Sequence, residues 1–176
     1  MIVLLAGVSG SGKTTVGSLL AVRLGWIFAD GDSFHSAANV ARMHAGQPLT
    51  DADRRPWLGA IAAWMDERIS AGQSAVVACS ALRRAYRDAL LDGRPSARMV
   101  FLQVSRDQDA GRLTARQGHF FPAGLLDSQF AALEMPQDSE RILVLNAQRS
   151  PADVVADIVA ALGLGTGPAG GTGRAG

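Results

Sequence analysis

The segment Gly7-Val8-Ser9-Gly10-Ser11-Gly12-Lys13-Thr14 decides the fold of this 176-residue chain. It matches the pattern G-x-x-x-x-G-K-[ST] at every fixed position, and in that pattern backbone N–H groups and the lysine hold the phosphates of a nucleotide. Lys13 is the only lysine, and all the other basic residues are arginines. Because a flexible ammonium and a planar guanidinium are not interchangeable, this exception indicates a lysine that grips a phosphate. The sequence therefore predicts a protein that binds a nucleoside triphosphate.

The residues on both sides of this loop support the prediction. Ile2–Ala6 is a short apolar run typical of a buried parallel strand, and Thr14–Leu24 has the apolar spacing of a helix that ends at Gly25. The positive end of that helix would point at the phosphates, and the Thr14 hydroxyl is a candidate ligand of Mg²⁺. A glycine-rich turn that matched the pattern by chance would not need a strand before it and a helix after it. The predicted ATP-binding residues of the loop are Gly7, Val8, Ser9, Gly10, Ser11, Gly12, Lys13, Thr14 and Thr15.

Composition and charge argue against several kinds of partner. The formal net charge is +1 and the arginines are scattered, so the chain has no field that would hold nucleic acid. The single Cys79 rules out an internal disulfide, and no apolar run approaches the roughly 20 residues that cross a bilayer. The first residues show no signal-peptide pattern. We expect a cytoplasmic protein without a nucleic-acid or membrane partner.

Apolar runs and helical patterns alternate along the rest of the chain. Further strands are expected at Trp26–Ala29, Ala75–Cys79, Met99–Val104 and Ile142–Leu145. Further helices are expected at Ser36–Ala45, Arg54–Ala71, Arg83–Leu91, Asp107–Gln117, Leu125–Leu133 and Pro151–Leu162. This alternation predicts an α/β fold with a parallel sheet covered on both faces. One domain is expected over residues 1–162, followed by a disordered Gly/Ala-rich tail over residues 163–176.

A first group of polar residues follows the second expected strand. Asp30 and Asp32 lie at its carboxyl end, where open parallel sheets place their ligands. A carboxylate near a phosphate loop is unfavourable unless it acts on Mg²⁺ or on a hydroxyl proton, which favours a functional role for Asp32. His35, Asn39 and Arg42 follow at a spacing that would share one face of a helix. Such mixed donors and acceptors suit a polyhydroxylated anion, although a solvated polar face would carry the same residues.

A second group begins with a helix-capping pattern. Thr50 or Asp53 could cap the following helix, and Pro56 favours a helix start close to itself, because a proline deeper inside leaves a carbonyl without its donor. Capping does not explain Arg54, which is either a surface ion-pair partner or an anion clamp. Trp57 is expected in the core.

A third group follows the third expected strand. Ser80 and Arg83 lie where the chain leaves the ligand-binding edge of the sheet, so a hydroxyl and a guanidinium could face one pocket. Arg84 and Asp88 have the spacing of a surface pair on a helix. Cys79 has no histidine near it in sequence and is expected to be a small buried hydrophobe.

A fourth group has the features of a lid. Arg112 and Arg116 are four residues apart on an expected helix that leads into a segment bracketed by Gly118 and Gly124. Closure of such a segment would carry guanidinium groups onto the triphosphate and exclude water. Two exposed arginines on an amphipathic helix are the alternative. The role of His119 stays open.

Taken together, these groups resemble the bacterial gluconate kinase family. The matching segments are GVSGSGKTT at 7–15, DGDSFH at 30–35, Asn39, Arg42-Met43, GQPL at 46–49, DADRRPWL at 51–58, CSALRRAYRD at 79–88, ARQGHFF at 115–121 and SQFAALEMP at 128–136. The ordered set spans about residues 3–162 and is specific to this family, whereas the phosphate loop alone is widely shared. Family members commonly carry lysine where this chain has Arg42, Arg83 and Gln117. Gln117 loses a charge, which argues against a phosphate contact there.

The resemblance implies the small P-loop kinase fold of nucleoside monophosphate and shikimate kinases, with a five-stranded parallel sheet and a mobile lid at about residues 116–125. It further implies a homodimer that converts ATP and D-gluconate into ADP and 6-phosphogluconate. The implied catalytic residues are Lys13, Asp32 and Arg116, with Thr14 and Asp30 on the Mg²⁺ side and Arg112 near the adenine. The implied substrate-binding residues are Asp32, His35, Asn39, Arg42, Arg54, Ser80 and Arg83.

Two other functions remain open at this point. Shikimate kinases resemble one another in a glycine triplet after the third strand, where this chain has Ser80-Ala81-Leu82. A nucleotide-dependent switch without turnover belongs to a different class. A guanine-specific switch should carry an N-K-x-D string, which a chain with Lys13 as its only lysine cannot contain.

Overall fold

The computed structural model describes residues 1–105 and 123–165 of the chain. Five strands in these residues form one parallel sheet in the order β2-β3-β1-β4-β5. They are β1 (Ile2–Ala6), β2 (Ile27–Asp30), β3 (Ala75–Ala78), β4 (Ala97–Gln103) and β5 (Leu143–Asn146). The helices are α1 (Lys13–Leu24), α2 (Ala37–His44), α3 (Asp51–Ser70), α4 (Arg84–Leu91), α6 (Ala123–Ala132) and α7 (Pro151–Ala161), with 3-10 turns η1 (Gly31–Phe34) and η2 (Asp138–Glu140). The expected α/β fold with a five-stranded parallel sheet is confirmed.

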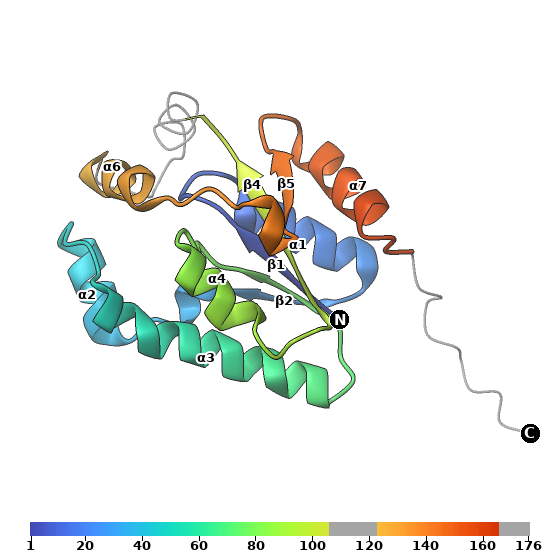
Figure 1. Ribbon diagram of the computed structural model, residues 1–176, viewed down its shortest axis with the longest axis horizontal. Coiled ribbons are helices and arrows are strands. Elements are labelled where there is room, and N and C mark those ends of the chain that lie inside the picture. Colours follow the sequence, from blue (N-terminus) through green and yellow to red (C-terminus); the bar gives the residue numbers. More distant parts are fainter. Residues whose placement is uncertain (106–122, 166–176) are drawn as a thin grey trace, which may run out of the picture.

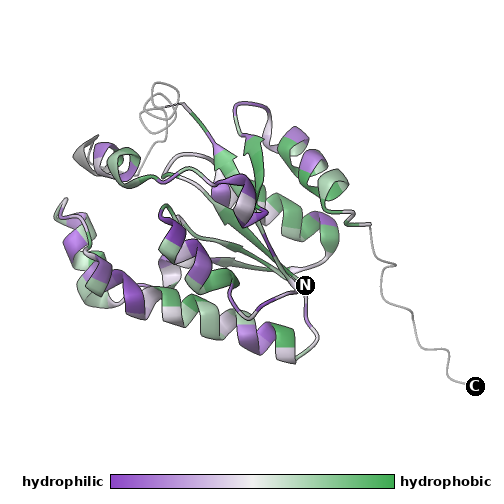
Figure 2. Ribbon diagram, in the orientation of Figure 1, coloured by the Kyte–Doolittle hydropathy of each residue, from purple (hydrophilic) through white to green (hydrophobic). Residues whose placement is uncertain are grey.

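The central strand β1 is buried on both faces. Val3 and Leu5 join the core that α1 and α7 cover, whereas Ile2 and Leu4 join the core under α3 and α4. Figure 1 shows these two pairs of helices on opposite sides of the sheet, and Figure 2 shows that the strands between them are hydrophobic along their length. Because helices cover both faces, the central strands β1 and β3 are continuously apolar and do not alternate between apolar and polar residues.

The topology places the phosphate loop at the point where the strand order reverses. β1 connects through α1 to β2, which lies at one edge of the sheet beyond β3, while β4 and β5 lie on the other side of β1. Open parallel sheets bind ligands outside the carboxyl ends of their strands at such a point. The loop over residues 7–12 occupies this position.

Helix α3 begins at Asp51, before the expected start at Arg54. The Thr50 hydroxyl accepts a hydrogen bond from the backbone N–H of Asp53, and the Asp53 carboxylate accepts one from the backbone N–H of Thr50 at 2.8 Å. This capping box satisfies two N–H groups that would otherwise lack partners, so it determines the start of the helix. Pro56 therefore lies inside the helix, and the expectation of a start close to it is wrong.

The packed part of the chain extends beyond Leu162, the expected end of the domain. The backbone N–H of Leu164 donates to the Val159 carbonyl at 2.9 Å, and that of Gly163 donates to the Ala160 carbonyl. Gly163 has a φ of +62°, so these bonds form a glycine-capped helix end that returns the chain to the core. Leu164 is buried there. The first residues of the expected tail are therefore packed. Gly163 caps the end of α7, a role that the glycine-rich composition of the tail does not reveal.

Several expectations fall on residues outside the described ranges. The expected helix Asp107–Gln117, most of the lid at 116–125, and the tail from residue 166 onward lie there. Within residues 1–105 and 123–165, no helix combines the length and apolar character needed to cross a membrane.

Candidate active site

Glycines shape the phosphate loop between β1 and α1. Gly7 has a φ of +140°, and a Cβ at this position would lie 2.7 Å from the Leu102 carbonyl oxygen and 2.9 Å from Ser11 Oγ. Only glycine fits such a close approach. Gly12 directly precedes α1, so the loop amides and the positive end of the helix dipole act on the same space. Ser11 Oγ is buried there without a hydrogen-bond partner in the described part of the chain. This loop therefore fits the phosphates of a nucleotide.

Lys13, Thr14 and Asp30 form the charged edge of the loop. Lys13 Nζ donates to the Val8 carbonyl at 2.8 Å, and Thr14 Oγ1 donates to Asp30 Oδ2 at 2.9 Å. The predicted Mg²⁺ side is thus a hydroxyl beside a carboxylate. The described residues contain no group of three His, Cys, Asp or Glu side chains that could hold a metal ion alone. Mg²⁺ is usually held by one or two carboxylates together with substrate phosphates, and this arrangement fits that rule.

The segment Asp30-Gly31-Asp32 is fixed by packing as well as by its carboxylates. A Cβ on Gly31 would lie 2.3 Å from the Ala78 carbonyl oxygen, so η1 crosses β3 too closely for any other residue. The indole N–H of Trp57 donates to the Gly31 carbonyl at 2.7 Å and belongs to the core, as predicted. The backbone N–H of Asp32 donates to Asp30 Oδ1 at 3.0 Å. These contacts leave the exposed Asp32 carboxylate at the carboxyl end of β2.

His35 does not share a helix face with Asn39 and Arg42, contrary to the prediction. It precedes α2 in extended backbone, because Ser36 caps that helix. Its imidazole instead stacks on Trp57, with ring centroids 4.4 Å apart and planes 9° from parallel. Burial lowers the pKa of His35 below its ordinary value, partly against the raising effect of Asp32. The ring is therefore neutral at neutral pH, so one ring nitrogen can donate a hydrogen bond and the other can accept one.

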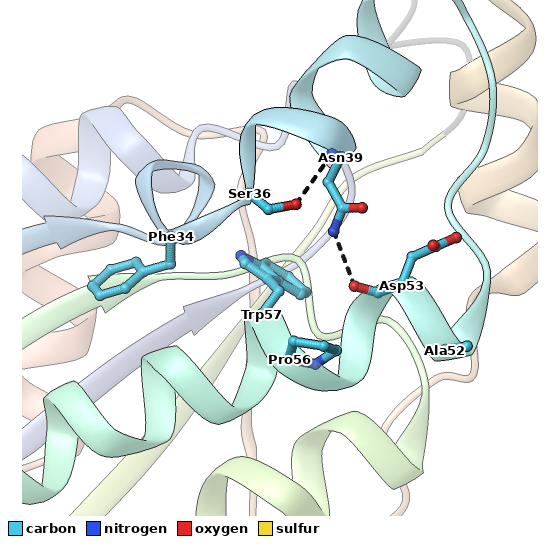
Figure 3. A pocket seen from close by; sticks show the side chains of 7 residues that line it. All are labelled: Phe34, Ser36, Asn39, Ala52, Asp53, Pro56 and Trp57. Carbon is cyan, nitrogen blue, oxygen red and sulfur yellow. Dashed lines mark hydrogen bonds between the residues drawn. The ribbon is translucent and has the colours of Figure 1, made fainter.

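Asn39 and Arg42 both bind Asp53 of α3. Asn39 Nδ2 donates to the Asp53 carbonyl at 2.9 Å, and Arg42 Nη1 contacts both carboxylate oxygens at 3.0 Å. The same carboxylate caps α3. In this arrangement the two predicted substrate ligands join α2 to α3. Of these two residues, Asn39 also borders a cavity of about 310 Å³, whose lining residues are Phe34, Ser36, Asn39, Ala52, Asp53, Pro56 and Trp57 (Figure 3).

Ser80 lies directly against the phosphate loop. Its carbonyl accepts a hydrogen bond from the backbone N–H of Gly7 at 3.2 Å. The next residue, Ala81, is buried and has a φ of +37°, a left-handed conformation that is unfavourable for alanine. The chain therefore leaves β3 through a strained turn that holds Ser80 beside Gly7.

The arginines Arg54 and Arg83 line a second cavity of about 170 Å³. Its lining residues are Pro48, Leu49, Asp51, Arg54, Leu82, Arg83, Tyr86, Ser128, Gln129 and Ala132. Arg83 pairs with Asp51 at 2.8 Å, and Asp51 also accepts a hydrogen bond from the Tyr86 hydroxyl, which lowers the pKa of the carboxyl. Arg54 lies over the Tyr86 ring and forms no ion pair with a carboxylate in residues 1–105 or 123–165. Its guanidinium is the available anion-binding group of this cavity.

Charged groups from three parts of the site lie near Cys79, at the end of β3. Burial raises the pKa of the Cys79 thiol to about 12, so the thiol is an inert core group, as predicted. The same pKa responds to the charges of Lys13, Asp32 and Arg54. Groups from the phosphate loop, from η1 and from α3 therefore lie within electrostatic reach of one point at the end of β3.

Gln129 of α6 is a site residue that the sequence reasoning missed. Its Oε1 accepts a hydrogen bond from the backbone N–H of Ser9 at 2.7 Å, and its Nε2 donates to Ser9 Oγ at 2.9 Å. It also lines the cavity with Arg54 and Arg83. The signal in the sequence is that Gln129 belongs to the segment SQFAALEMP, one of those that resemble the family.

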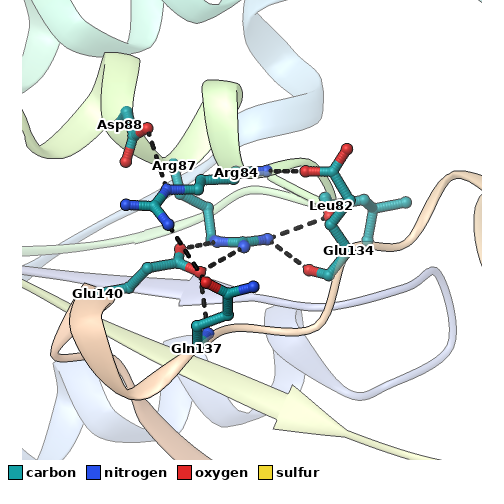
Figure 4. A network of polar contacts seen from close by, with 7 residues as sticks. All are labelled: Leu82, Arg84, Arg87, Asp88, Glu134, Gln137 and Glu140. Carbon is teal, nitrogen blue, oxygen red and sulfur yellow. Dashed lines mark hydrogen bonds and ion pairs between the residues drawn. The ribbon is translucent and has the colours of Figure 1, made fainter.

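Arg87 of α4 was also not predicted. It is buried, forms two hydrogen bonds with the buried Glu140 carboxylate, and donates to the carbonyls of Leu82 and Glu134 (Figure 4). These contacts lower the pKa of Glu140, chiefly through the hydrogen bond from Arg87. They fasten the segment after α6 to α4 and to the turn after β3. The predicted surface pair Arg84–Asp88 is confirmed at 3.6 Å.

The predicted nucleotide contacts Arg112 and Arg116 lie outside the described residues, as does His119. Their roles stay predictions.

Comparison with known proteins extends over most of the chain. Residues 2–136 match a protein family described as an AAA domain. A gluconokinase of Gluconobacter oxydans is 47% identical over 153 residues, which are 87% of this chain and 86% of that protein. A sugar kinase from Janibacter sp., solved without ligand, is 44% identical with a TM-score of 0.88, over 94% of this chain and 95% of that one. A gluconokinase from Sinorhizobium meliloti is 40% identical with a TM-score of 0.80, over 92% and 90% of the two chains. With its phosphate loop, its parallel sheet and this identity, the chain belongs to the gluconokinase family of P-loop kinases.

Proposed function

We propose that this protein transfers the γ-phosphoryl group of ATP to the terminal hydroxyl of D-gluconate, forming ADP and 6-phosphogluconate. The observation that carries the proposal is the position of Arg54, which lines the cavity next to the phosphate loop and has no carboxylate partner in the described part of the chain. A sugar acid offers one carboxylate that a guanidinium can bind and a row of hydroxyls. The identity with gluconokinases supports the same activity.

The remaining predicted ligands fit different parts of such a substrate. The proposed substrate-binding set is Asp32, His35, Asn39, Arg42, Arg54, Ser80 and Arg83. Asp32, His35 and Ser80 would meet hydroxyl groups, because each offers a hydrogen-bonding side chain near the loop. Arg42 and Arg83 already hold Asp53 and Asp51, which neutralise much of their charge. They would contact substrate only by sharing or exchanging those aspartates, so Arg54 is the principal anion ligand.

The proposed chemistry assigns one task to each charged group. Asp32 would accept the proton of the terminal hydroxyl as that oxygen attacks the γ-phosphorus in line. Lys13 would stabilise the charge that spreads over the transferring group. Thr14 and Asp30 would hold Mg²⁺, which supplies charge neutralisation on the phosphate oxygens when it is bound with ATP. From the family resemblance we also propose a cytoplasmic homodimer.

The test of this function is a coupled assay of ADP release. With ATP and Mg²⁺, gluconate should stimulate ADP release strongly, whereas shikimate and nucleoside monophosphates should not. Stimulation by shikimate would favour the alternative small-molecule kinase. An absence of stimulation by any sugar acid would contradict the proposal and favour a nucleotide-dependent switch.

The role of Arg54 is tested with a matched pair of neighbouring arginines. Arg54→Met should raise the KM for gluconate at least about tenfold with little change in the KM for ATP, because a charged hydrogen bond is lost. Arg55 is exposed and does not line the cavity, so Arg55→Met is the control. Equal KM values for gluconate in the two variants would contradict the assignment.

A further inference from the structure

Gln129 joins two parts of the site that are far apart in sequence. Ser9 belongs to the phosphate loop, and Gln129 lies on α6, 120 residues later. The contact is two-pointed, since the side-chain oxygen accepts from Ser9 N–H and the side-chain nitrogen donates to Ser9 Oγ. The Ser9 N–H needs an acceptor, which fixes the orientation of the amide. A glutamine therefore fits here in one orientation only.

The helix that carries Gln129 is held firmly at its carboxyl end. The backbone N–H of Glu134 donates to the Leu82 carbonyl at 3.0 Å, and the buried Arg87 donates to the Glu134 carbonyl at 2.8 Å. The Glu134 carboxylate accepts from the backbone N–H of Arg84 at 2.7 Å. Figure 4 shows this network around the first turn of α4. The segment after α6 is thus tied to α4, and the Gln129 side chain joins α6 to the phosphate loop.

Gln129 is also part of the cavity that contains Arg54. One side chain therefore touches the phosphate loop and borders the space assigned to the sugar acid. Whichever ligand binds first would order Gln129 and Ser9, and the second ligand would then meet a lower entropic cost of ordering them.

We propose that Gln129 is a positioning residue that couples the sugar-acid cavity to the phosphate loop, so that gluconate and the nucleotide strengthen each other's binding. This inference rests on the proposed function. By linkage, the factor by which gluconate raises nucleotide affinity equals the factor by which the nucleotide raises gluconate affinity.

Isothermal titration calorimetry with a non-hydrolysable ATP analogue and Mg²⁺, with and without saturating gluconate, tests the coupling. In the wild type, gluconate should raise the affinity for the analogue at least about fivefold. In Gln129→Met, which keeps the length of the side chain but removes both hydrogen bonds, the increase should be less than about twofold. Gln148→Met, an exposed glutamine after β5, should retain the wild-type coupling.

Two more variants show whether the coupling depends on the hydrogen bonds of Gln129 or on the charge at this position. Gln129→Glu still offers acceptors to Ser9 N–H and O–H, so it should keep the coupling but weaken nucleotide binding by placing a negative charge near the phosphates. Ser9→Ala keeps the backbone contact and should show intermediate coupling. Wild-type coupling in Gln129→Met, or no coupling in a wild type that binds gluconate, would overturn the inference alone. A wild type that does not bind gluconate would contradict the proposed function itself.

Discussion

The two halves of this site are built in opposite ways. The phosphate side is one continuous loop, residues 7–14, whose shape follows from its own glycines and from the helix that begins at Lys13. The acceptor side is assembled from α3, the residue that precedes α4, and α6, which contribute Arg54, Arg83 and Gln129 to one cavity. Distant side chains contact both halves, as Gln129 contacts Ser9, but only the acceptor side takes its binding groups from separate segments.

Because of this difference, substitutions in the two halves should affect different properties, catalysis in one and stability in the other. A change at the tip of the continuous loop should remove a catalytic group without disturbing packing. A change in the network of Arg87 and Glu140 should destabilise the fold without removing any catalytic group of the loop. The following predictions test this separation.

Lys13→Met should give the largest effect on catalysis. The lost ammonium stabilises the transferring phosphoryl group, so kcat should fall at least about a hundredfold, while the melting temperature should stay close to that of the wild type. Steady-state kinetics and thermal unfolding measure both quantities. Arg23→Met, at an exposed position in the last turn of the same helix, is the control. Near-normal turnover in Lys13→Met would refute the role of the lysine.

Arg87→Ala should give the largest effect on stability. It leaves the buried Glu140 carboxylate unpaired, so the free energy of unfolding should fall by about 3–5 kcal/mol. Arg84→Ala removes a half-exposed pair on the same helix and should cost less than about 1 kcal/mol. Chemical denaturation compares the two variants. Similar losses in both would mean that the buried pair of Arg87 and Glu140 contributes no more stability than an exposed pair.

The same ion pair predicts an acid dependence of stability. Because the folded-state pKa of Glu140 is lowered, its stabilisation is complete above the ordinary glutamate pKa of about 4.3 and is lost as pH falls through the folded value. The difference in unfolding free energy between the wild type and Glu140→Gln should therefore shrink from pH 6 toward pH 3. Asp138→Asn, on the same 3-10 turn, should show a small difference at both pH values. A Glu140→Gln difference that does not vary with pH would contradict the lowered pKa.

Truncation of the C-terminus tests whether Leu164 stabilises the core beside α1, the helix that follows the phosphate loop. Removal of all residues after Gly165 should leave the melting temperature unchanged. Removal after Leu162 also deletes the buried Leu164, which packs in the core beside α1, and should cost about 1–2 kcal/mol of stability. Chemical denaturation distinguishes the two truncations. Equal stability would show that Leu164 contributes nothing to the core.

Prediction from the sequence succeeded where the signal is local. The loop, the strand before it and the helix after it could be read directly, because glycine spacing and apolar runs depend on neighbouring residues. The start of α3 was misjudged although Thr50 and Asp53 were recognised as caps, because a capping box outweighs the cost of Pro56. The spacing of His35, Asn39 and Arg42 predicts a shared helix face, but Ser36 caps α2 and the helix begins at Ala37, so His35 lies outside it.

The sequence by itself determined a P-loop kinase fold and a phosphate site, since those features lie within short segments whose backbone conformation their own residues dictate. Only the tertiary structure decided which arginines are available for an anion. The sequence does not distinguish the four arginines Arg42, Arg54, Arg83 and Arg87. Aspartates pair with Arg42 and Arg83, and Glu140 pairs with the buried Arg87. Of the four, Arg54 alone lines the cavity without a carboxylate partner among the described residues. The partners of a charged side chain depend on segments that meet only in the folded chain, and those contacts leave no local pattern.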